Sequence, residues 1–253
     1  MTPPRTVSVV GFKDSGKTRV VEALLGELTR RGYRVGTVKH TAENIDFDTP
    51  GKDTRRHRDA GAVASAILHE NAAAFFLDNH VPINDAVRTL GAVDYLVIEG
   101  FKTLDTHARI LVPREDADID KLRNGLEIAA VKIPGSGFSG EGGVEVVELS
   151  DAAKLADIVE SRAYPMLPGT NCHGCGYTDC RDLGEAILGG DADATRCVRN
   201  YEAFILKVNG ESLPLNNFVR RALTNMLTGF IKALKGGEDA ERVELAFEVD
   251  PDG

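Results

Sequence analysis

All four cysteines of this 253-residue chain lie in one short stretch, at Cys172, Cys175, Cys180 and Cys197. Their spacing is Cys-x2-Cys-x4-Cys-x16-Cys. Thiolates that lie close together either oxidise or share a metal, and four of them complete the ligand set of one metal centre. The stretch is therefore a candidate metal site.

A phosphate-binding motif lies near the start of the chain. Residues 11–18 read Gly-Phe-Lys-Asp-Ser-Gly-Lys-Thr and match Gly-x4-Gly-Lys-Thr. Glycines let the backbone wrap a phosphate closely with its N–H groups, and the following helix adds its positive dipole end. The motif assigns Lys17 to the β- and γ-phosphates and the Thr18 hydroxyl to Mg²⁺. The nucleotide-binding residues that we predict are Gly11, Lys13, Asp14, Ser15, Gly16, Lys17 and Thr18. A chance glycine turn is the alternative, and Lys13 is as easily a solvated loop lysine.

An acidic residue suited to the same site ends the apolar run Asp94–Glu99. An acid at the carboxyl end of a buried strand beside a phosphate loop holds Mg²⁺ directly or through water. We therefore predict Glu99 as a magnesium and catalytic residue, and we expect Asp94 to start the strand and face solvent. The alternative for Glu99 is a plain surface acid at a strand end.

The elements that must position these residues follow from hydrophobic patterns. Thr6–Val10 and Tyr33–Lys39 read as strands on either side of a helix from Lys17 to about Arg31, which predicts a parallel pair with a right-handed crossover. Several later runs are continuously apolar, as in a sheet covered on both faces. The further strands that we predict are 65–68, 73–77, 95–98, 108–112 and 128–133, and a helix is predicted at 151–162.

The prolines of Tyr164–Gly169 mark a boundary after the first domain. Beyond the cysteines, Asn209-Gly210 predicts a hairpin turn, 217–235 a helix and 243–249 a terminal strand. We therefore predict three parts: a nucleotide-binding domain at 1–162, a metal segment at 163–200 and a small α+β unit at 201–253.

Composition excludes several classes of partner. Thirty basic and thirty-nine acidic residues give a formal charge of −9, which argues against a broad nucleic-acid or anionic-membrane surface. No apolar run approaches the ~20 residues of a membrane span, and the first residues do not read as a secretory signal. We expect a cytoplasmic, reducing location, where clustered cysteines are more often metal ligands than disulfides.

Several short motifs accompany the phosphate loop, namely Val38-Lys39-His40, Pro50-Gly51-Lys52-Asp53, Arg56-His57-Arg58, Ala60-Gly61-Ala62 and Ile98-Glu99-Gly100-Phe101-Lys102. Over residues 5–160 this joint pattern resembles a known family, the molybdopterin-guanine dinucleotide biosynthesis protein B family (MobB). The resemblance implies a three-layer P-loop NTPase fold with a mainly parallel sheet, usually dimeric. It implies GTP and Mg²⁺ binding in support of the guanylyltransferase, MobA-like, that joins GMP to molybdopterin in molybdenum or tungsten cofactor synthesis. By that likeness Asp46, Asp48, Lys52 and Asp53 face the active cleft, with Asp46 and Asp48 as catalytic candidates beside Lys17 and Glu99.

The choice of GTP depends on this resemblance alone. The sequence holds no Asn-Lys-x-Asp tetrapeptide, the usual guanine reader, and Lys102-Thr103-Leu104-Asp105 has the wrong spacing to replace it.

For the cysteines, three classes compete, namely zinc, an iron–sulfur cluster and disulfides, and unliganded thiols are the remaining alternative. Structural zinc commonly uses two Cys-x2-Cys pairs, and this array has one. Gly174 and Gly176 flank Cys175 and let N–H groups approach cluster sulfides, which favours iron–sulfur. The stretch Leu167 to Cys197 also resembles the small [4Fe-4S] domain of several anaerobic redox proteins, although Val198 stands where a proline often follows the last cysteine.

Together these features predict a GTP-binding accessory protein, a weak GTPase, that carries a [4Fe-4S] cluster. Two alternatives remain open. A small-molecule or nucleotide kinase shares the phosphate loop and would use the basic charge of Arg55, Arg56 and Arg58. A non-catalytic iron–sulfur adaptor would dock a redox enzyme or a cofactor transferase through the cluster segment and the last fifty residues.

Overall fold

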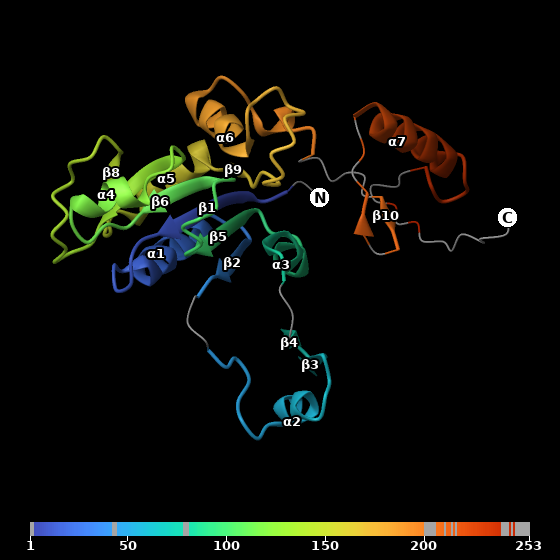
Figure 1. Ribbon diagram of the computed structural model, residues 1–253, viewed down its shortest axis with the longest axis horizontal. Helices are drawn as coiled ribbons and strands as arrows, with labels where there is room; N and C mark the ends of the chain where they lie inside the picture. Colours follow the sequence, from blue (N-terminus) through green and yellow to red (C-terminus); the bar gives the residue numbers. More distant parts are fainter. Residues whose placement is uncertain are drawn as a thin grey trace. The chain divides into compact units, whose positions relative to one another are not determined.

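The computed structural model describes residues 3–41, 45–77, 81–199, 206–209, 211–213, 215, 217–238, 243 and 245. The chain divides into two compact units, residues 1–200 and 201–253 (Figure 1). The cysteine segment belongs to the first of them. The three-part division at 162 and 200 stays a prediction.

In the described residues of the first unit, seven strands form one sheet in the order β2-β5-β1-β6-β7-β8, with β9 added beside β1. Every neighbouring pair on that path is parallel, and β9 is antiparallel to β1. The strands are β1 Arg5–Val10, β2 Val35–Lys39, β5 Tyr95–Glu99, β6 Ala108–Leu111, β7 Glu127–Lys132, β8 Val146–Glu148 and β9 Tyr164–Pro165. The mainly parallel α/β fold is confirmed.

Helices cover both faces of this sheet (Figure 1). The core on one face joins Val7 and Val9 of β1 to Leu24 of α1 (Lys17–Arg30) and Leu155 of α5 (Ala152–Arg162). On the other face Val10 and Leu111 pack with Leu122 of α4 (Ala117–Leu122). All positions of β5 and β6 are buried, because strands covered on both sides must be apolar throughout.

One part of the sequence-based topology was wrong. We expected the strand before the phosphate loop and the strand at Tyr33–Lys39 to be neighbours, but β5 lies between β1 and β2 and pairs with both. The burial of the strands explains the order. The wholly buried β5 takes an interior place, whereas β2 is half-exposed and suits the edge.

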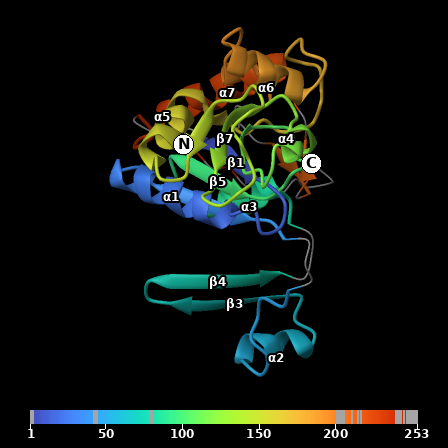
Figure 2. The same ribbon diagram turned by 90° about the vertical axis from the view of Figure 1, so that its left-hand side faces the viewer.

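Two of the predicted strands do not belong to the central sheet. β3 (Ala64–His69) and β4 (Ala72–Leu77) pair with each other in a separate antiparallel hairpin. The connection from β2 to β5 also carries α2 (Asp53–Asp59) and α3 (Ile83–Thr89). Figure 2 shows α2 beside the hairpin, and the Arg58 guanidinium carbon of α2 lies 5.8 Å from the ring centroid of Phe76 in β4. The two-residue turn between the strands favours this local pairing.

The cysteine segment contains α6 (Cys180–Gly189) and a short 3₁₀ helix at Ala194–Arg196. In the second unit, β10 (Lys207–Val208) pairs with β11 (Glu211–Ser212), which confirms a hairpin there, and α7 spans Asn217–Lys232. Of the predicted strand at 243–249, all but 243 and 245 lies outside the described residues. Among the described helices, none has the length and hydropathy to cross a membrane.

Candidate functional site

The phosphate loop lies between the end of β1 at Val10 and the start of α1 at Lys17. Two of its positions require glycine. A Cβ on Gly11 would come within 2.6 Å of the Val112 carbonyl oxygen, and Gly16 has φ +90°. Because Gly16 has no side chain to cap α1, the first N–H groups of the helix remain available to an anion.

Lys17 folds back across this loop. Its Nζ donates to the carbonyl oxygen of Phe12 at 2.6 Å. Burial lowers its pKa, Glu99 opposes that shift, and the neighbouring Lys102 and Lys39 lower the pKa further. Several cations therefore converge on the loop.

Ser15 supplies a second sign that the loop is built for a ligand. Its side chain is buried, and within the described residues its hydroxyl oxygen has no hydrogen-bond partner. A buried hydroxyl without a partner is costly, and a bound phosphate oxygen would satisfy it.

The two predicted magnesium residues lie together. Glu99 ends β5, and its Oε1 accepts a hydrogen bond from the Thr18 hydroxyl at 3.0 Å. The Nζ of Lys39, at the end of β2, lies 3.0 Å from the same oxygen. Glu99 is 9% exposed and so is not a plain surface acid. A hydroxyl and a carboxylate on adjacent elements are the hard oxygen donors that Mg²⁺ prefers, so these residues fit the ion.

Asp94 behaves as expected, because it precedes β5, is exposed and accepts a hydrogen bond from the backbone N–H of Arg34 at 2.8 Å. Lys39 is a site residue that we did not predict, although it stands in the Val38-Lys39-His40 motif. The motif gave no hint of its ion pair, which depends on β2 being the neighbour of β5.

Asp46 and Asp48 have partners on α2, in their own segment of the chain. Asp48 is 4% exposed and accepts from the Thr54 hydroxyl at 3.0 Å, with Arg58 at 3.6 Å. Asp46 pairs with Arg55, and that hydrogen bond lowers its pKa. Their role at the nucleotide, like that of Lys52 and Asp53, stays a prediction.

The four cysteines occupy a tightly turned segment, with no disulfide among these described residues. Cys180 is the first residue of α6, and its N–H donates to Asn171 Oδ1 at 2.9 Å. Cys180 and Cys197 are buried in the core, whereas Cys172 and Cys175 are half-buried. Positive φ values of 45° at Asn171, 56° at His173 and 89° at Gly176 show that the backbone of this loop turns sharply at several positions. In the described residues, no three metal-ligating side chains are grouped closely enough to hold an ion.

The environment of Cys172 favours a thiolate. Burial works to raise its pKa, but the Gly174 N–H, the Thr170 hydroxyl and Arg199 outweigh burial, and the pKa is lowered. Gly174 lies close to this thiol, because a Cβ built on it would be 3.7 Å from Cys172 Sγ and 2.8 Å from Val198 Cγ2. Four cysteines with close backbone donors are a ligand set that suits an iron–sulfur cluster.

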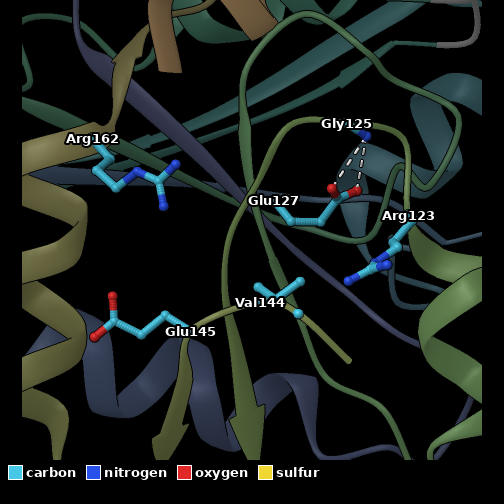
Figure 3. A pocket seen from close by; sticks show the side chains of 7 residues that line it. Arg123, Gly125, Glu127, Val144, Glu145 and Arg162 are labelled. Carbon is cyan, nitrogen blue, oxygen red and sulfur yellow. Dashed lines mark hydrogen bonds between the residues drawn. The ribbon is translucent and has the colours of Figure 1, made fainter. Parts of the chain in front are cut away.

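A surface pocket of about 470 Å³ lies elsewhere in the fold (Figure 3). It includes Glu127, the first residue of β7, and so belongs to the amino end of the parallel strands. The phosphate loop follows the carboxyl end of β1, which is the opposite edge of the sheet. Glu127 already accepts hydrogen bonds from Gly125 N–H at 3.1 and 3.2 Å. This pocket is therefore not the predicted nucleotide site.

Comparison with known proteins agrees with the fold and motifs. Residues 6–133 match the family model "Molybdopterin guanine dinucleotide synthesis protein B", and residues 167–199 match a model described as "Putative Fe-S cluster". A Methanocaldococcus jannaschii protein named "Putative molybdopterin-guanine dinucleotide biosynthesis adapter protein" is 27% identical over 97% of this chain and 98% of its own length. A Bacillus subtilis protein named "Probable molybdopterin-guanine dinucleotide biosynthesis adapter protein" is 31% identical over 46% of this chain and 69% of its own length.

The fold has a solved counterpart in the crystal structure of Bacillus subtilis MobB. That structure covers 63% of this chain and 98% of its own, with a TM-score of 0.54 and 25% sequence identity. The phosphate loop, the Thr18–Glu99 contact and the family match over half of the residues lead to one assignment. The chain belongs to the molybdopterin guanine dinucleotide synthesis protein B family and carries an additional segment that matches the model described as "Putative Fe-S cluster".

Proposed function

We propose that this protein binds GTP with Mg²⁺ and presents it to the guanylyltransferase that attaches GMP to molybdopterin. The observation that carries the proposal is the contact between Thr18 and Glu99 beside Lys17, which joins a hydroxyl, a carboxylate and an ammonium group at one loop. Guanine, rather than adenine, is supported by the family membership and by the names of the relatives.

The mechanism that this geometry supports is electrostatic. The loop N–H groups and Lys17 would hold the phosphates, and Thr18 and Glu99 would hold the magnesium ion that neutralises their charge. A weak GTPase activity needs a group that orients water, and Asp46 and Asp48 are the candidates from the family likeness.

We also propose that Cys172, Cys175, Cys180 and Cys197 hold a [4Fe-4S] cluster, which when bound exchanges one electron reversibly. The match to the iron–sulfur model and the lowered pKa of Cys172 support this. Cluster binding would require the loop to draw its sulfurs closer together. Once there, the cluster would also fasten a segment with little core of its own.

The kinase alternative gains no support from its arginines. Arg55 and Arg56 pair with Asp59 and Asp53 of the same helix, and Arg58 pairs with Asp48. A lid that closes on an acceptor needs guanidinium groups that face a ligand instead. The adaptor reading is compatible with GTP binding, since the relatives are named as adapters.

One experiment tests both halves of the proposal. The full chain, purified without oxygen, should bind GTP in the presence of Mg²⁺ and contain about four iron and four sulfide ions, the content of the cluster type. Lys17→Ala should lose GTP binding, as followed by fluorescence titration, yet keep its iron and visible absorption. Lys154→Ala, which removes a surface lysine paired with Glu145, is the matched control and should bind GTP normally. Iron-free protein would refute the cluster, and undiminished GTP affinity in Lys17→Ala would refute the site.

A further inference from the structure

Two cations lie on the ring of Phe12, the residue that follows the first glycine of the phosphate loop. Lys102 Nζ is 4.4 Å from the ring centroid and the Arg114 guanidinium carbon is 4.8 Å from it. Lys102 follows β5 and Arg114 follows β6, and these are the two parallel neighbours of β1. The strand order therefore brings a cation from each adjacent strand end to the loop.

Arg114 is held in place from one side. Its Nε donates to Asp118 Oδ2 at 3.0 Å, and its backbone N–H donates to the same oxygen at 3.1 Å. Asp118 is completely buried, whereas the Arg114 side chain is 49% exposed. The Nη1 nitrogen of Arg114 has no acceptor within the part of the chain described, so its N–H groups can serve a ligand. A guanidinium fixed by a carboxylate and an aromatic face loses little freedom when it binds an anion.

The positive charges around the phosphate loop favour the binding of an anion. Lys17 Nζ donates to the carbonyl oxygen of Phe12, and Lys102 Nζ lies over the ring of the same residue, so two ammonium groups meet at Phe12. Glu99 is already in contact with Lys39. Lys102 rests on an aromatic ring, and no carboxylate partner is found for it among the described residues. An additional negative charge at this point would relieve the mutual repulsion of the lysines.

The positions of Lys102 and Arg114 indicate which phosphate group these two cations would bind. In this type of loop the backbone N–H groups wrap the inner phosphates, and Lys17 reaches the β- and γ-phosphates. Lys102 lies three residues beyond Glu99, the predicted magnesium residue that ends β5. A magnesium ion held by Thr18 and Glu99 would neutralise the β- and γ-phosphates, and the further charge that these two cations suit is that of the outermost phosphate.

We propose that Lys102 and Arg114, seated on the Phe12 ring, form a second anion site beside the phosphate loop that binds the terminal phosphate of the nucleoside triphosphate. The inference rests on the proposed nucleotide binding and adds a specific consequence. The site distinguishes a triphosphate from a diphosphate, because GDP has no phosphate to place between these two cations. GTP loading and release after hydrolysis then depend on Arg114 and Lys102.

The test compares GTP and GDP affinities, with Mg²⁺, for the full-length wild type and for variants. Arg114→Gln alone leaves the buried Asp118 carboxylate without its partner and endangers folding. The main variant is therefore the double substitution Arg114→Gln with Asp118→Asn, which removes both charges together. Lys102→Gln tests the other cation. Arg34→Gln is the matched control, since Arg34 also pairs with an aspartate, Asp94, but precedes β2 at the opposite edge of the sheet.

We expect the double variant and Lys102→Gln each to raise the Kd for GTP by roughly tenfold or more, about 1.4 kcal/mol, as for loss of a charge-assisted hydrogen bond. The Kd for GDP should change by less than about twofold, and Arg34→Gln should change neither value. Equal losses for GTP and GDP, or no loss in a folded variant, would overturn the inference while leaving nucleotide binding intact. Wild-type protein that binds neither nucleotide would overturn the proposed function and this inference together.

Discussion

At the scale of single residues, one carboxylate oxygen links three elements. Oε1 of Glu99 lies 3.0 Å from both the Thr18 hydroxyl of α1 and the Lys39 ammonium of β2. The lysine neutralises a carboxylate that the fold has largely removed from water. A divalent ion that binds here must compete with Lys39 for this oxygen, so metal and nucleotide binding are expected to displace that ammonium group toward the phosphates.

A buried histidine predicts how stability depends on pH. His107 is 1% exposed, and its Nδ1 lies 3.0 Å from the Thr106 hydroxyl. Burial, and secondly the charge of Arg109, lower its pKa to about 3. An unfolded histidine titrates near ~6.5, so below that pH the unfolded chain binds a proton that the folded chain does not. His107 therefore costs stability as the pH falls from about 6.5 toward 3, by up to about 1.4 kcal/mol per pH unit.

We expect His107→Leu to lose less unfolding free energy than wild type between pH 7.5 and 5.5, measured by urea denaturation. His57→Leu, at an exposed position on α2, should keep the wild-type pH dependence. If the unfolding free energies of wild type and His107→Leu decrease equally as the pH falls, His107 is not a neutral buried group.

The phosphate loop was predictable because its chemistry is contained in eight consecutive residues. Glu99 could be found because a carboxylate at the end of an apolar run carries its own signal. Lys39, Lys102 and Arg114 carried no such signal, since Glu99 comes near Lys39, and Phe12 comes near Lys102 and Arg114, only through strand order. A one-dimensional pattern does not contain that order, and our expectation for β1 and β2 shows how easily it is misread.

At the scale of elements, α6 packs closely onto the nucleotide-binding fold. A Cβ on Gly184 would come 2.5 Å from the Tyr164 hydroxyl oxygen and 2.9 Å from Leu126 Cδ2. Glycine is therefore needed here for close approach, although it weakens a helix by roughly 0.5–1 kcal/mol relative to alanine. Gly26, within α1, is the natural comparison, because a Cβ placed on it would meet no atom of the described residues within 4 Å.

We predict opposite effects for two identical substitutions. Gly26→Ala should stabilise the protein by about 0.5–1 kcal/mol, because it improves helix propensity without a clash. Gly184→Ala should destabilise by about 1–3 kcal/mol, because overpacking pushes α6 from Tyr164 and Leu126. Urea denaturation gives both values, and visible absorption shows whether the displaced α6 affects binding of the proposed cluster. Stabilisation by Gly184→Ala would contradict the close packing.

Helices and strands were predicted correctly where their apolar runs were long. They were missed where the apolar run was short or lay among residues interpreted as metal ligands. α1 and the buried strands were found from contiguous hydrophobic residues. α6 was missed, because its residues were treated as a ligand loop, and its apolar face is short. β3 and β4 were found as strands, but their separate sheet was not predicted, since alternation cannot show which strand a neighbour will be.

At the scale of the whole molecule, the cysteine segment and the central parallel sheet share a core. Cys180, Leu183 and Cys197 belong to the same hydrophobic cluster as Val7 and Leu24. The segment is therefore an integral part of the first unit rather than a tethered appendage. Removing it at residue 164 would expose that core, so a functional truncation of the C-terminal part should begin at residue 201.

The β3–β4 hairpin presents an uncovered apolar face. α2 lies against the face that contains Phe76, and alternation puts Leu68, Phe75 and Leu77 on the other face. These three side chains are 74%, 59% and 50% exposed. A two-stranded hairpin is marginally stable alone, and exposed apolar patches of this kind mark protein contacts. We propose that a second copy of the chain covers this face, in line with the dimer that the family likeness implied.

The dimer can be tested with a single charge. Phe75→Glu should convert a dimer into a monomer in sedimentation equilibrium, because a buried unpaired carboxylate costs several kcal/mol. Phe230→Glu, at a position 64% exposed on α7, is the matched control and should leave the mass unchanged. GTP binding by the Phe75→Glu monomer would show that the phosphate loop works within one chain. A wild type that stays monomeric at all concentrations, or a Phe75→Glu variant that still dimerises, would exclude this face as the contact between copies.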